Sequence, residues 1–499
     1  MLFRRQRCLL PILLLLLAAC TPVGPDYRPP DAAMPDTWAS DRARTAANPT
    51  GSAERWWGVF DDPVLTALVE RALEANHDLR IATSRITAAR ARLRLTSAAT
   101  SPTLDTGANY SSTRRSENTG SNNGNGGSSD SGDSQDLFEA GFDADWEIDL
   151  FGGQRRAVES AEATLSATEE DRRDVLITLE AEVARGYFDL TGNRRLLATA
   201  RDTLAAQEKT LGVVDGRLQL GLASGLESSQ AKTQASLIAA RIPNLEQLIA
   251  ANINQLALLL DLPPSDMAQR LDGSTPSIRL PAALPAGLPS DLLRRRPDIR
   301  RAERMLAAAS AEVGVATADL FPRFSLSALA GLQSASLSDL VSSGSRYWSI
   351  GPSFSLPLFD RGRLYAALDI TEADLAEMLA SYEKTVLAAL LETETALVRY
   401  SREQERRDRL AEAVNTARQT ATFNEGLYAT GLADLTDVLD SQRTLYAAED
   451  QLIDSERQLA QNVVALYKAL GGGWEISEPV AATGASDNEP HNDTSGISP

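Results

Sequence analysis

The chain has 499 residues, of which 43% are hydrophobic, and its 68 acidic against 49 basic side chains give a formal net charge of −19. A chain of this length usually forms more than one domain. The acidic balance provides no electrostatic basis for binding nucleic acid. With two cysteines and two histidines, a disulfide framework or a metal cluster is nearly excluded, so we expect neither a metal nor a cofactor.

The first twenty residues predict export from the cytoplasm. Three arginines precede the apolar run Leu9–Leu17, which is shorter than the roughly 20 residues that span a bilayer. We therefore expect a signal peptide over residues 1–19. Cys20 follows small residues, a pattern similar to a bacterial lipobox, so we expect Cys20 to be lipidated. Thr21 is similar to the residue that sorts such lipoproteins to the outer membrane. The alternative is an ordinary signal peptide with an incidental cysteine.

The chain repeats itself. Residues 77–104 match residues 297–324 at an offset of 220, and the offset falls to 208 where the segment ending at Phe151 matches the one ending at Phe359. The first copy therefore has 12 extra residues between its first two strands, in the glycine-, serine- and asparagine-rich stretch Ser116–Ser134. That composition predicts a flexible loop.

Each copy contains two segments in which apolar and polar residues alternate strictly. Such alternation predicts strands: 102–112, 138–150, 322–333 and 346–358. One face is apolar and aromatic and the other is polar, which suits a barrel wall between lipid and a wet lumen. The alternative is a soluble sandwich with half-buried strands. Because four strands cannot close a barrel and an open edge in lipid leaves backbone groups unsatisfied, a membrane barrel requires several chains.

Long helices follow the strands in both copies. Residues 154–220 contain no proline, nor do residues 362–428, and each run would extend on the order of 100 Å as a helix. Near the end of the second copy, large or small apolar residues recur every seven positions, which predicts a coiled-coil seam: Leu439, Tyr446, Ile453, Ala460 and Tyr467. Pro243 predicts a kink or break in the matching helix of the first copy.

Several separate segments together resemble one protein family: Cys20–Tyr27 followed by Pro29 and Pro30, Trp56–Pro63, Leu293–Asp298 with Ala302 and Glu303, and Ala318–Pro322. These segments resemble the outer-membrane factor family of TolC-like proteins, in particular its OprM/NodT-type efflux lipoproteins. The resemblance covers residues 20–473. It implies an α+β membrane protein, a trimer whose four strands per chain form one twelve-stranded β-barrel, continued by a long periplasmic α-helical barrel.

The resemblance also implies the domain organisation. After the signal peptide comes an N-terminal collar segment over residues 20–75. The first repeat occupies residues 76–270 and the second occupies residues 291–470, with a linker over 271–290 between them. Residues 471–499 are expected to add a second collar segment and then a disordered tail, because they become rich in Asn, Asp, Ser and Gly.

The function that the resemblance implies is passive conduction in the outer membrane of a Gram-negative bacterium. The chain would be the lipid-anchored exit channel of a tripartite efflux system for drugs or other small toxic compounds. The chain would form a homotrimer. Its partners would be a periplasmic adaptor (membrane-fusion) protein, an inner-membrane RND pump and outer-membrane lipid. The alternatives are a type I protein-secretion duct and a periplasmic coiled-coil scaffold. No catalytic constellation, phosphate-binding loop or metal-ligand spacing occurs in the sequence, so we expect no enzymatic activity.

The turns of the two helical hairpins are the predicted periplasmic mouth. Glycine allows a long helix to reverse, and Asp437 and Asp440, just past the second turn, are three residues apart and so share a helical face. Three chains would then form a ring of carboxylates that attracts cations. The resemblance places the gate at Asp437 and Asp440, with tip-closing contacts at Glu227 and Tyr428. The alternative is that both aspartates lie on a solvated helix face.

The same turns are similar to the family's docking motifs for the adaptor, here Leu220, Gly221 and Leu222 in the first copy and Thr430, Gly431 and Leu432 in the second. One departure concerns the gate. The family's prototype has a tip arginine two residues after the glycine, and this chain has Ala433.

Overall fold

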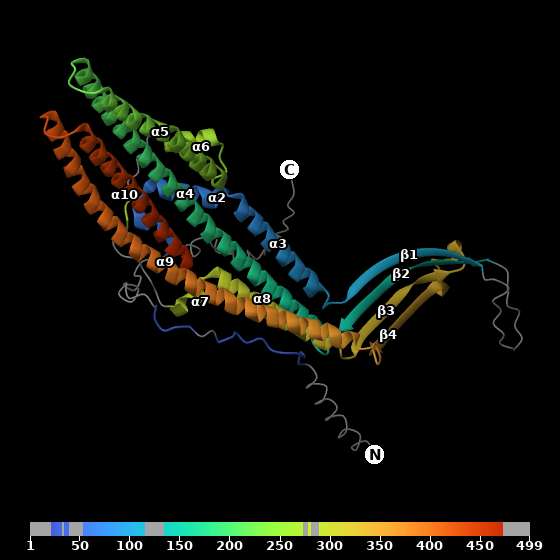
Figure 1. The fold of residues 1–499 in the computed structure, drawn as a ribbon. Helices are drawn as coiled ribbons and strands as arrows, with labels where there is room; N and C mark the ends of the chain where they lie inside the picture. Colours follow the sequence, from blue (N-terminus) through green and yellow to red (C-terminus); the bar gives the residue numbers. More distant parts are fainter. Residues whose placement is uncertain are drawn as a thin grey trace, which may run out of the picture. The chain divides into compact units, whose positions relative to one another are not determined.

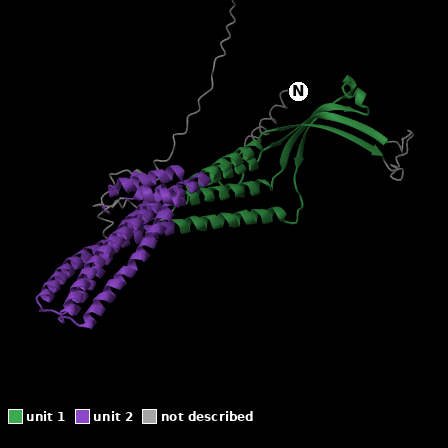
Figure 2. Cartoon of the chain, turned by 90° about the horizontal axis from the view of Figure 1, so that it is seen from above, with its two compact units in different colours: residues 1–32, 83–170, 299–385 green, residues 33–82, 171–298, 386–499 purple. Residues whose placement is uncertain are grey.

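The computed structural model describes residues 21–31, 34–38, 53–114, 134–272, 278–280 and 289–472. Cys20, the signal segment and all but the last residue of Ser116–Ser134 lie outside these residues, as does most of 471–499. The chain divides into two compact units (Figure 2). Unit 1 comprises residues 1–32, 83–170 and 299–385, and unit 2 comprises residues 33–82, 171–298 and 386–499.

The four predicted strands form one antiparallel sheet in unit 1, in the order β1-β2-β3-β4 (Figure 1). They are β1 (Thr103–Arg114), β2 (Ser134–Ile148), β3 (Arg323–Ser334) and β4 (Arg346–Ser355), and two short 3-10 turns, η5 (Leu337–Asp339) and η6 (Ser343–Ser345), connect β3 to β4. The strand predictions are confirmed to within a few residues. Strands β1 and β4 are the two edges of the sheet.

The register of the sheet brings like residues together on each face. Leu104 pairs with Ala144, which pairs with Ala328, which pairs with Ile350, and directly paired residues share a face. On the opposite face Asp145 pairs with Ser327, and the Ser327 hydroxyl donates to the Asp145 carboxylate at 2.6 Å. The predicted separation of an apolar and a polar face therefore holds across all four strands.

The helices are continuous over the predicted lengths. Helix α4 (Gly153–Gln219) and helix α9 (Arg363–Ala429) each have 67 residues, and each is followed across a short turn by a helix of 35 residues, α5 (Gly225–Leu259) and α10 (Leu435–Ala469). The five residues of the predicted seam on α10 are all buried or half-buried. The sequence predicted a kink or a break at Pro243, and the break does not occur, because α5 continues through this residue. Pro243 is exposed, so water can satisfy the carbonyl that the ring leaves without a donor.

A buried aromatic core in unit 2 explains the Trp56–Pro63 motif. Trp56 in the 3-10 helix η2 (Ala53–Phe60) stacks on Tyr467 of α10 with ring centroids 5.6 Å apart, and Phe60 packs on Phe188 of α4 at 4.6 Å. Asp62 caps helix α2 (Pro63–Ala75) by accepting from two backbone N–H groups, with proline at the first turn as expected. The motif therefore has two roles: its aromatic residues pack in the core, and Asp62 and Pro63 begin helix α2.

Helices shorter than α4, α5, α9 and α10 complete the fold. Helix α3 (His77–Ala98) precedes β1, and helix α8 (Pro297–Ala318) occupies the matching position before β3. The segment between the repeats contributes α6 (Pro264–Leu271), η4 (Pro289–Asp291) and α7 (Leu292–Arg295).

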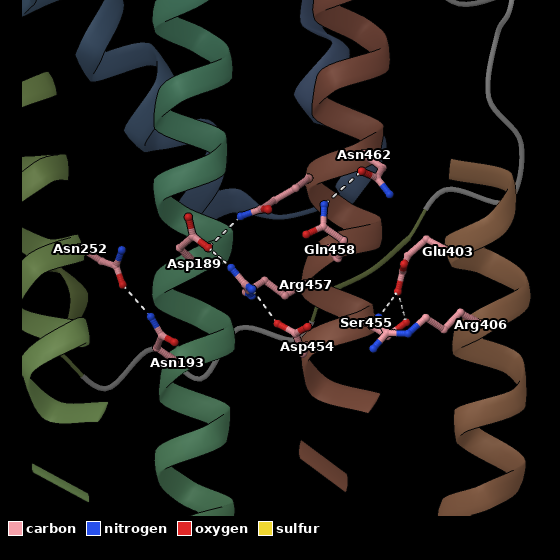
Figure 3. Close-up of polar contacts among 11 residues, drawn as sticks. Asp189, Asn193, Asn252, Glu403, Arg406, Asp454, Ser455, Arg457, Gln458 and Asn462 are labelled. Atoms are coloured by element: carbon pink, nitrogen blue, oxygen red, sulfur yellow. Dashed lines mark hydrogen bonds and ion pairs between the residues drawn. The ribbon is translucent and has the colours of Figure 1, made fainter. Parts of the chain in front are cut away.

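Polar side chains join the helices of unit 2 (Figure 3). Arg457 of α10 pairs with Asp454 at 2.6 Å and with Asp189 of α4, which also accepts from Gln461 at 2.7 Å. The Arg457 side chain crosses α4 at Gly192, where a Cβ would lie only 2.6 Å from its Cδ. A glycine at this position therefore lets the arginine reach its partner.

Candidate functional site

The two hairpin turns of unit 2 have the same backbone. Gly221 and Gly431 have φ angles of +71° and +78°, a region that glycine adopts at little cost. In the first turn the N–H of Leu222 donates to the Arg217 carbonyl at 2.8 Å, and in the second Leu432 donates to Leu427 at 2.8 Å. Both helices therefore end in the same left-handed glycine cap, as the sequence predicted for turns at these positions.

The helices that leave the turns also begin alike. Ser224 caps α5, and the Glu227 carboxylate accepts from the Ser224 backbone N–H at 2.5 Å, forming a capping box. Hydrogen bonds from the backbone and then from the side chain of Ser224 hold the pKa of Glu227 below its ordinary value. In the second turn Asp437 reaches the Asp434 backbone N–H in the same way at 3.4 Å. Glu227 and Asp437 thus occupy equivalent capping positions.

The two aspartates predicted for the mouth lie close together. Asp437 and Asp440 line one hollow between α9 and α10, which Thr416 and Asn424 of α9 also line. Asp440 forms an ion pair at 2.6 Å with Arg443, one turn further along α10, and both side chains are exposed. Each aspartate therefore has a local partner on its own helix.

Arg217, which the sequence analysis did not single out, contacts the predicted gate residue Tyr428. Its guanidinium carbon lies 4.7 Å from the centre of the Tyr428 ring, and its Nη1 donates to the Tyr428 carbonyl at 3.5 Å. The Tyr428 hydroxyl is buried and has no hydrogen-bond partner among the described residues. A guanidinium over an aromatic face is attractive, so this contact joins the end of α4 to the end of α9.

The predicted docking turns expose apolar side chains. Leu220, Leu222 and Leu432 are 67–76% exposed. The Thr430 hydroxyl, by contrast, donates back to the Leu427 carbonyl at 2.9 Å. The turns therefore offer leucines rather than hydroxyl groups to a partner.

Neither a membrane-crossing helix nor a metal site occurs in the part of the chain that the structure describes. No described helix has an apolar stretch long enough to cross a membrane. Among the same residues, no group of His, Cys, Asp and Glu side chains could hold a metal ion.

Comparison with known proteins identifies the family of the chain. Residues 68–261 and 288–472 match the family model of outer membrane efflux proteins. The chain belongs to the outer membrane efflux protein family. It is therefore an efflux component of the outer membrane and not an enzyme.

Named relatives cover almost the whole chain. The solvent efflux pump outer membrane protein SrpC of Pseudomonas putida is 34% identical over 475 residues, which span 93% of this chain and 98% of SrpC. The pyoverdine export outer membrane protein OpmQ of Pseudomonas putida is 36% identical, over 95% of this chain and 99% of OpmQ. The solved structure of the outer-membrane channel OprN superposes with a TM-score of 0.84 at 35% identity, covering 91% of this chain and 99% of OprN.

Proposed function

We propose that this outer membrane efflux protein is a homotrimer in which twelve strands form one barrel, continued by a helical barrel in the periplasm. The observation that carries the proposal is the open sheet. Its apolar face exposes large side chains such as Trp348 and Phe354, which are 77% and 71% exposed. The edges β1 and β4 have no further strand beside them among the described residues. In lipid both edges need partners.

The height of the apolar face fits a membrane. Aromatic or large apolar residues occur on this face of β2 from Phe138 to Ile148. Ten residues at about 3.4 Å each and a strand tilt of about 40° give a band roughly 26 Å tall, close to the apolar band of outer-membrane barrels.

The segment after Cys20 supports lipid anchoring at the base of the sheet. The Val23 N–H donates to the Phe151 carbonyl at 2.9 Å, just after β2. Arg156, whose side chain is almost wholly buried, forms an ion pair with Asp26 at 2.7 Å. Because these contacts fix the chain a few residues after Cys20, an acyl group there would enter lipid beside the barrel. Replacing Cys20 by Ser should abolish fatty-acid labelling, and unchanged labelling would contradict the anchor.

At the periplasmic end, we assign the mouth to Asp437 and Asp440, and the contacts that close it to Glu227, Tyr428 and Arg217. The paired location of the aspartates in one hollow and the ring contact between α4 and α9 support this assignment. The exposed leucines of Leu220–Leu222 and Thr430–Leu432 support docking of a periplasmic adaptor at the same turns. An inner-membrane RND pump would then supply the energy.

The domain boundaries belong to the same proposal. We assign residues 20–75 to a collar, because the aromatic residues of η2 pack on α4 and α10 within unit 2. The repeats are residues 76–270 and 291–470, linked by 271–290, and residues 471–499 continue the collar into the tail.

SrpC is named for solvent efflux and OpmQ for pyoverdine export, so we propose small molecules rather than polypeptides as the cargo. The test is a Gram-negative strain without its own outer-membrane ducts, carrying an RND pump and adaptor, with or without this chain. The chain should lower the intracellular accumulation of a fluorescent dye. Unchanged accumulation, or export of a polypeptide by a type I transporter in its place, would overturn the proposal.

A further inference from the structure

The apolar face of the sheet carries charge at one end only. This outer end is formed by the strand ends farthest from the helices, at Arg114, Ser134, Ser334 and Arg346. Among the strand residues of the apolar face three are charged, Arg114, Asp136 and Arg346, and all three lie within three residues of the outer end. On a lipid-facing surface a charge is costly in the middle of the bilayer and tolerated near its boundary. The outer end therefore suits the level of the lipid headgroups.

Aromatic residues just inside the outer end support this level. Trp348 and Tyr110 lie on the same face and are 77% and 57% exposed. Rings with a polar tip are typical of the boundary between lipid and water. The Tyr110 hydroxyl donates to the Asp136 carboxylate at 3.2 Å. Arg114 and Arg346 are exposed, and neither forms an ion pair with another described residue.

The two arginines favour an anionic partner with several oxygens. A guanidinium group presents several N–H donors in a plane, and this geometry matches the oxygens of a phosphate group. Phosphate is also the anionic group that lipids carry at the headgroup level. The chemistry of the outer end therefore indicates a phosphorylated lipid.

The two arginines of one chain are too far apart to share a phosphate. Across the sheet Arg346 is in register with Leu332, Ala140 and then Ala108. Ala108 precedes Arg114 by six residues in β1, or about 20 Å along the strand. The three strand spacings between β1 and β4 add about 14 Å in the other direction.

The next copy of the chain would bring the second arginine close. The outer ends of β1 and β4 are displaced by six residues over three strand spacings, as the tilted strands of a barrel require. In the proposed barrel β4 of one copy lies beside β1 of the next. One more step of about two residues places Arg114 of the next copy about 7 Å along the strand from Arg346.

We propose that Arg346 of one copy and Arg114 of the next together bind a phosphate group of an outer-leaflet lipid. The site recurs at each of the three β4–β1 junctions of the trimer. This inference rests on the proposed trimer and adds a lipid site that one chain alone cannot form. The phosphate neutralises two guanidinium groups that would otherwise repel each other across the junction, so the lipid also strengthens the contact between copies.

The first test is native mass spectrometry of the detergent-solubilised full chain with lipid A, a diphosphorylated glucosamine lipid, as the probe. Wild-type trimers should retain up to three lipids. Arg114→Gln and Arg346→Gln, each alone, should raise the Kd for the lipid at least tenfold, because every junction then lacks one guanidinium group. Lys209→Gln with Lys232→Gln removes two exposed charges from α4 and α5 and is the control, which should leave binding unchanged.

Two further arms identify the ligand. Lipid A from which both phosphates have been removed should bind at least tenfold more weakly, and equal binding would overturn the phosphate contact. Millimolar inorganic phosphate should not displace the lipid, because the acyl chains also hold it against the apolar face. Displacement by phosphate would overturn a lipid as the ligand.

Mixed trimers test the junction itself. Chains with Arg114→Gln and chains with Arg346→Gln are expressed together, one kind carrying a mass tag. A ring of three that contains both kinds has one junction with both arginines, so mixed trimers should retain one lipid with wild-type affinity and trimers of either variant alone none. Mixed trimers without a retained lipid would overturn the shared site while leaving the trimer standing. A monomeric wild type would overturn the proposed trimer as well.

Discussion

The two repeats place different side chains on the same backbone. Asn76, just before α3, donates to the Leu259 carbonyl at the end of α5 at 3.0 Å. Arg296, at the equivalent position before α8, donates to the Ala469 carbonyl at the end of α10 at 2.8 Å. This side-chain hydrogen bond, here called the joint, connects the start of one helix to the end of another. An amide makes it in the first repeat and a guanidinium makes it in the second. Both repeats therefore keep a hydrogen bond from a side chain to this backbone carbonyl, but the donor is neutral in the first repeat and charged in the second.

The hairpin tips differ in the same manner. The glycine caps agree, but an offset of 210 places Asp440 opposite Gln230, and Tyr428 opposite Leu218. Arg217 is opposite Leu427. The carboxylate pair is thus found only on the second tip, whereas the arginine that contacts Tyr428 comes from the first. The two turns therefore have equivalent backbones but carry different side chains.

Substitutions at the joint should give the largest difference in stability between the two repeats. Arg296 is 11% exposed and also pairs with Asp298 and Glu392, each at 2.8 Å. Asn76 also caps α3, because its Oδ1 accepts from the N–H groups of Asp78 and Leu79. Removing one partner of a buried ion pair costs about 3–5 kcal/mol, whereas losing a helix-capping side chain costs about 1 kcal/mol. Arg296→Ala should therefore lower the Tm of the solubilised protein more than Asn76→Ala does, as measured by circular dichroism. Equal losses would show that the two joints are energetically equivalent.

Substitutions at the hairpin tips should give the next largest difference, measured as channel opening. Loss of the Arg217–Tyr428 contact costs about 1 kcal/mol per chain. In the proposed trimer the three additive contributions amount to about 3 kcal/mol. Arg217→Ala should therefore raise the open probability in planar-bilayer recordings by up to about 100-fold. Leu427→Ala, at the equivalent position of the second repeat, is the control and should change it little. An unaltered conductance of Arg217→Ala would exclude this contact from the gate.

A buried carboxyl distinguishes the long helices. Glu180 of α4 is fully buried, accepts from the Trp56 indole N–H at 3.0 Å, and has no partner for its Oε1 among the described residues. Its equivalent on α9 is Leu390. Burial raises the pKa of Glu180 well above its ordinary value.

The folded chain therefore keeps a proton that the unfolded chain releases near the ordinary pKa of glutamate. Between the unfolded and the folded pKa, stability should fall as the pH rises. Glu180→Gln should remove this slope and raise the Tm at neutral pH relative to wild type, with no gain at acidic pH. A wild type and variant with parallel Tm curves from pH 4 to pH 8 would refute a protonated Glu180.

The glycine caps should give the smallest difference. Gly221 and Gly431 both have positive φ, and a Cβ added at either residue would meet no other atom within 4 Å. Alanine at either site should cost about 1 kcal/mol from backbone strain alone. Gly221→Ala and Gly431→Ala should therefore lower the Tm by similar small amounts. A loss at one tip several times that at the other would show that the turns are not equivalent.

Periodicity made most of the fold predictable. Alternation in residues 138–150 and the absence of proline from 154 to 220 are dense local signals, and both predictions were confirmed. No break occurs at Pro243, because this residue is exposed. Its exposure follows from tertiary packing, which the local sequence does not show. The Arg217–Tyr428 contact joins residues 211 apart, so no local pattern indicates it.

The candidate site shows the same limit. The spacing of Ser224 and Glu227 is a capping-box signature that could have identified the local role of Glu227 before the structure did. Asp437 shares that role. The ion pair of Asp440 with Arg443 on the same helix depends on which rotamers the two side chains adopt, and residue spacing alone does not determine these.

The most direct test of the proposed mouth is the reversal potential of single channels in a salt gradient. Wild-type protein should be cation-selective. Asp437→Asn with Asp440→Asn should move the reversal potential towards zero, because the carboxylates of the three chains in the proposed trimer would no longer line the mouth. Gln230→Ala, opposite Asp440 on the first tip, should leave it unchanged. A double variant with wild-type selectivity would contradict the assignment of the mouth to the second tip.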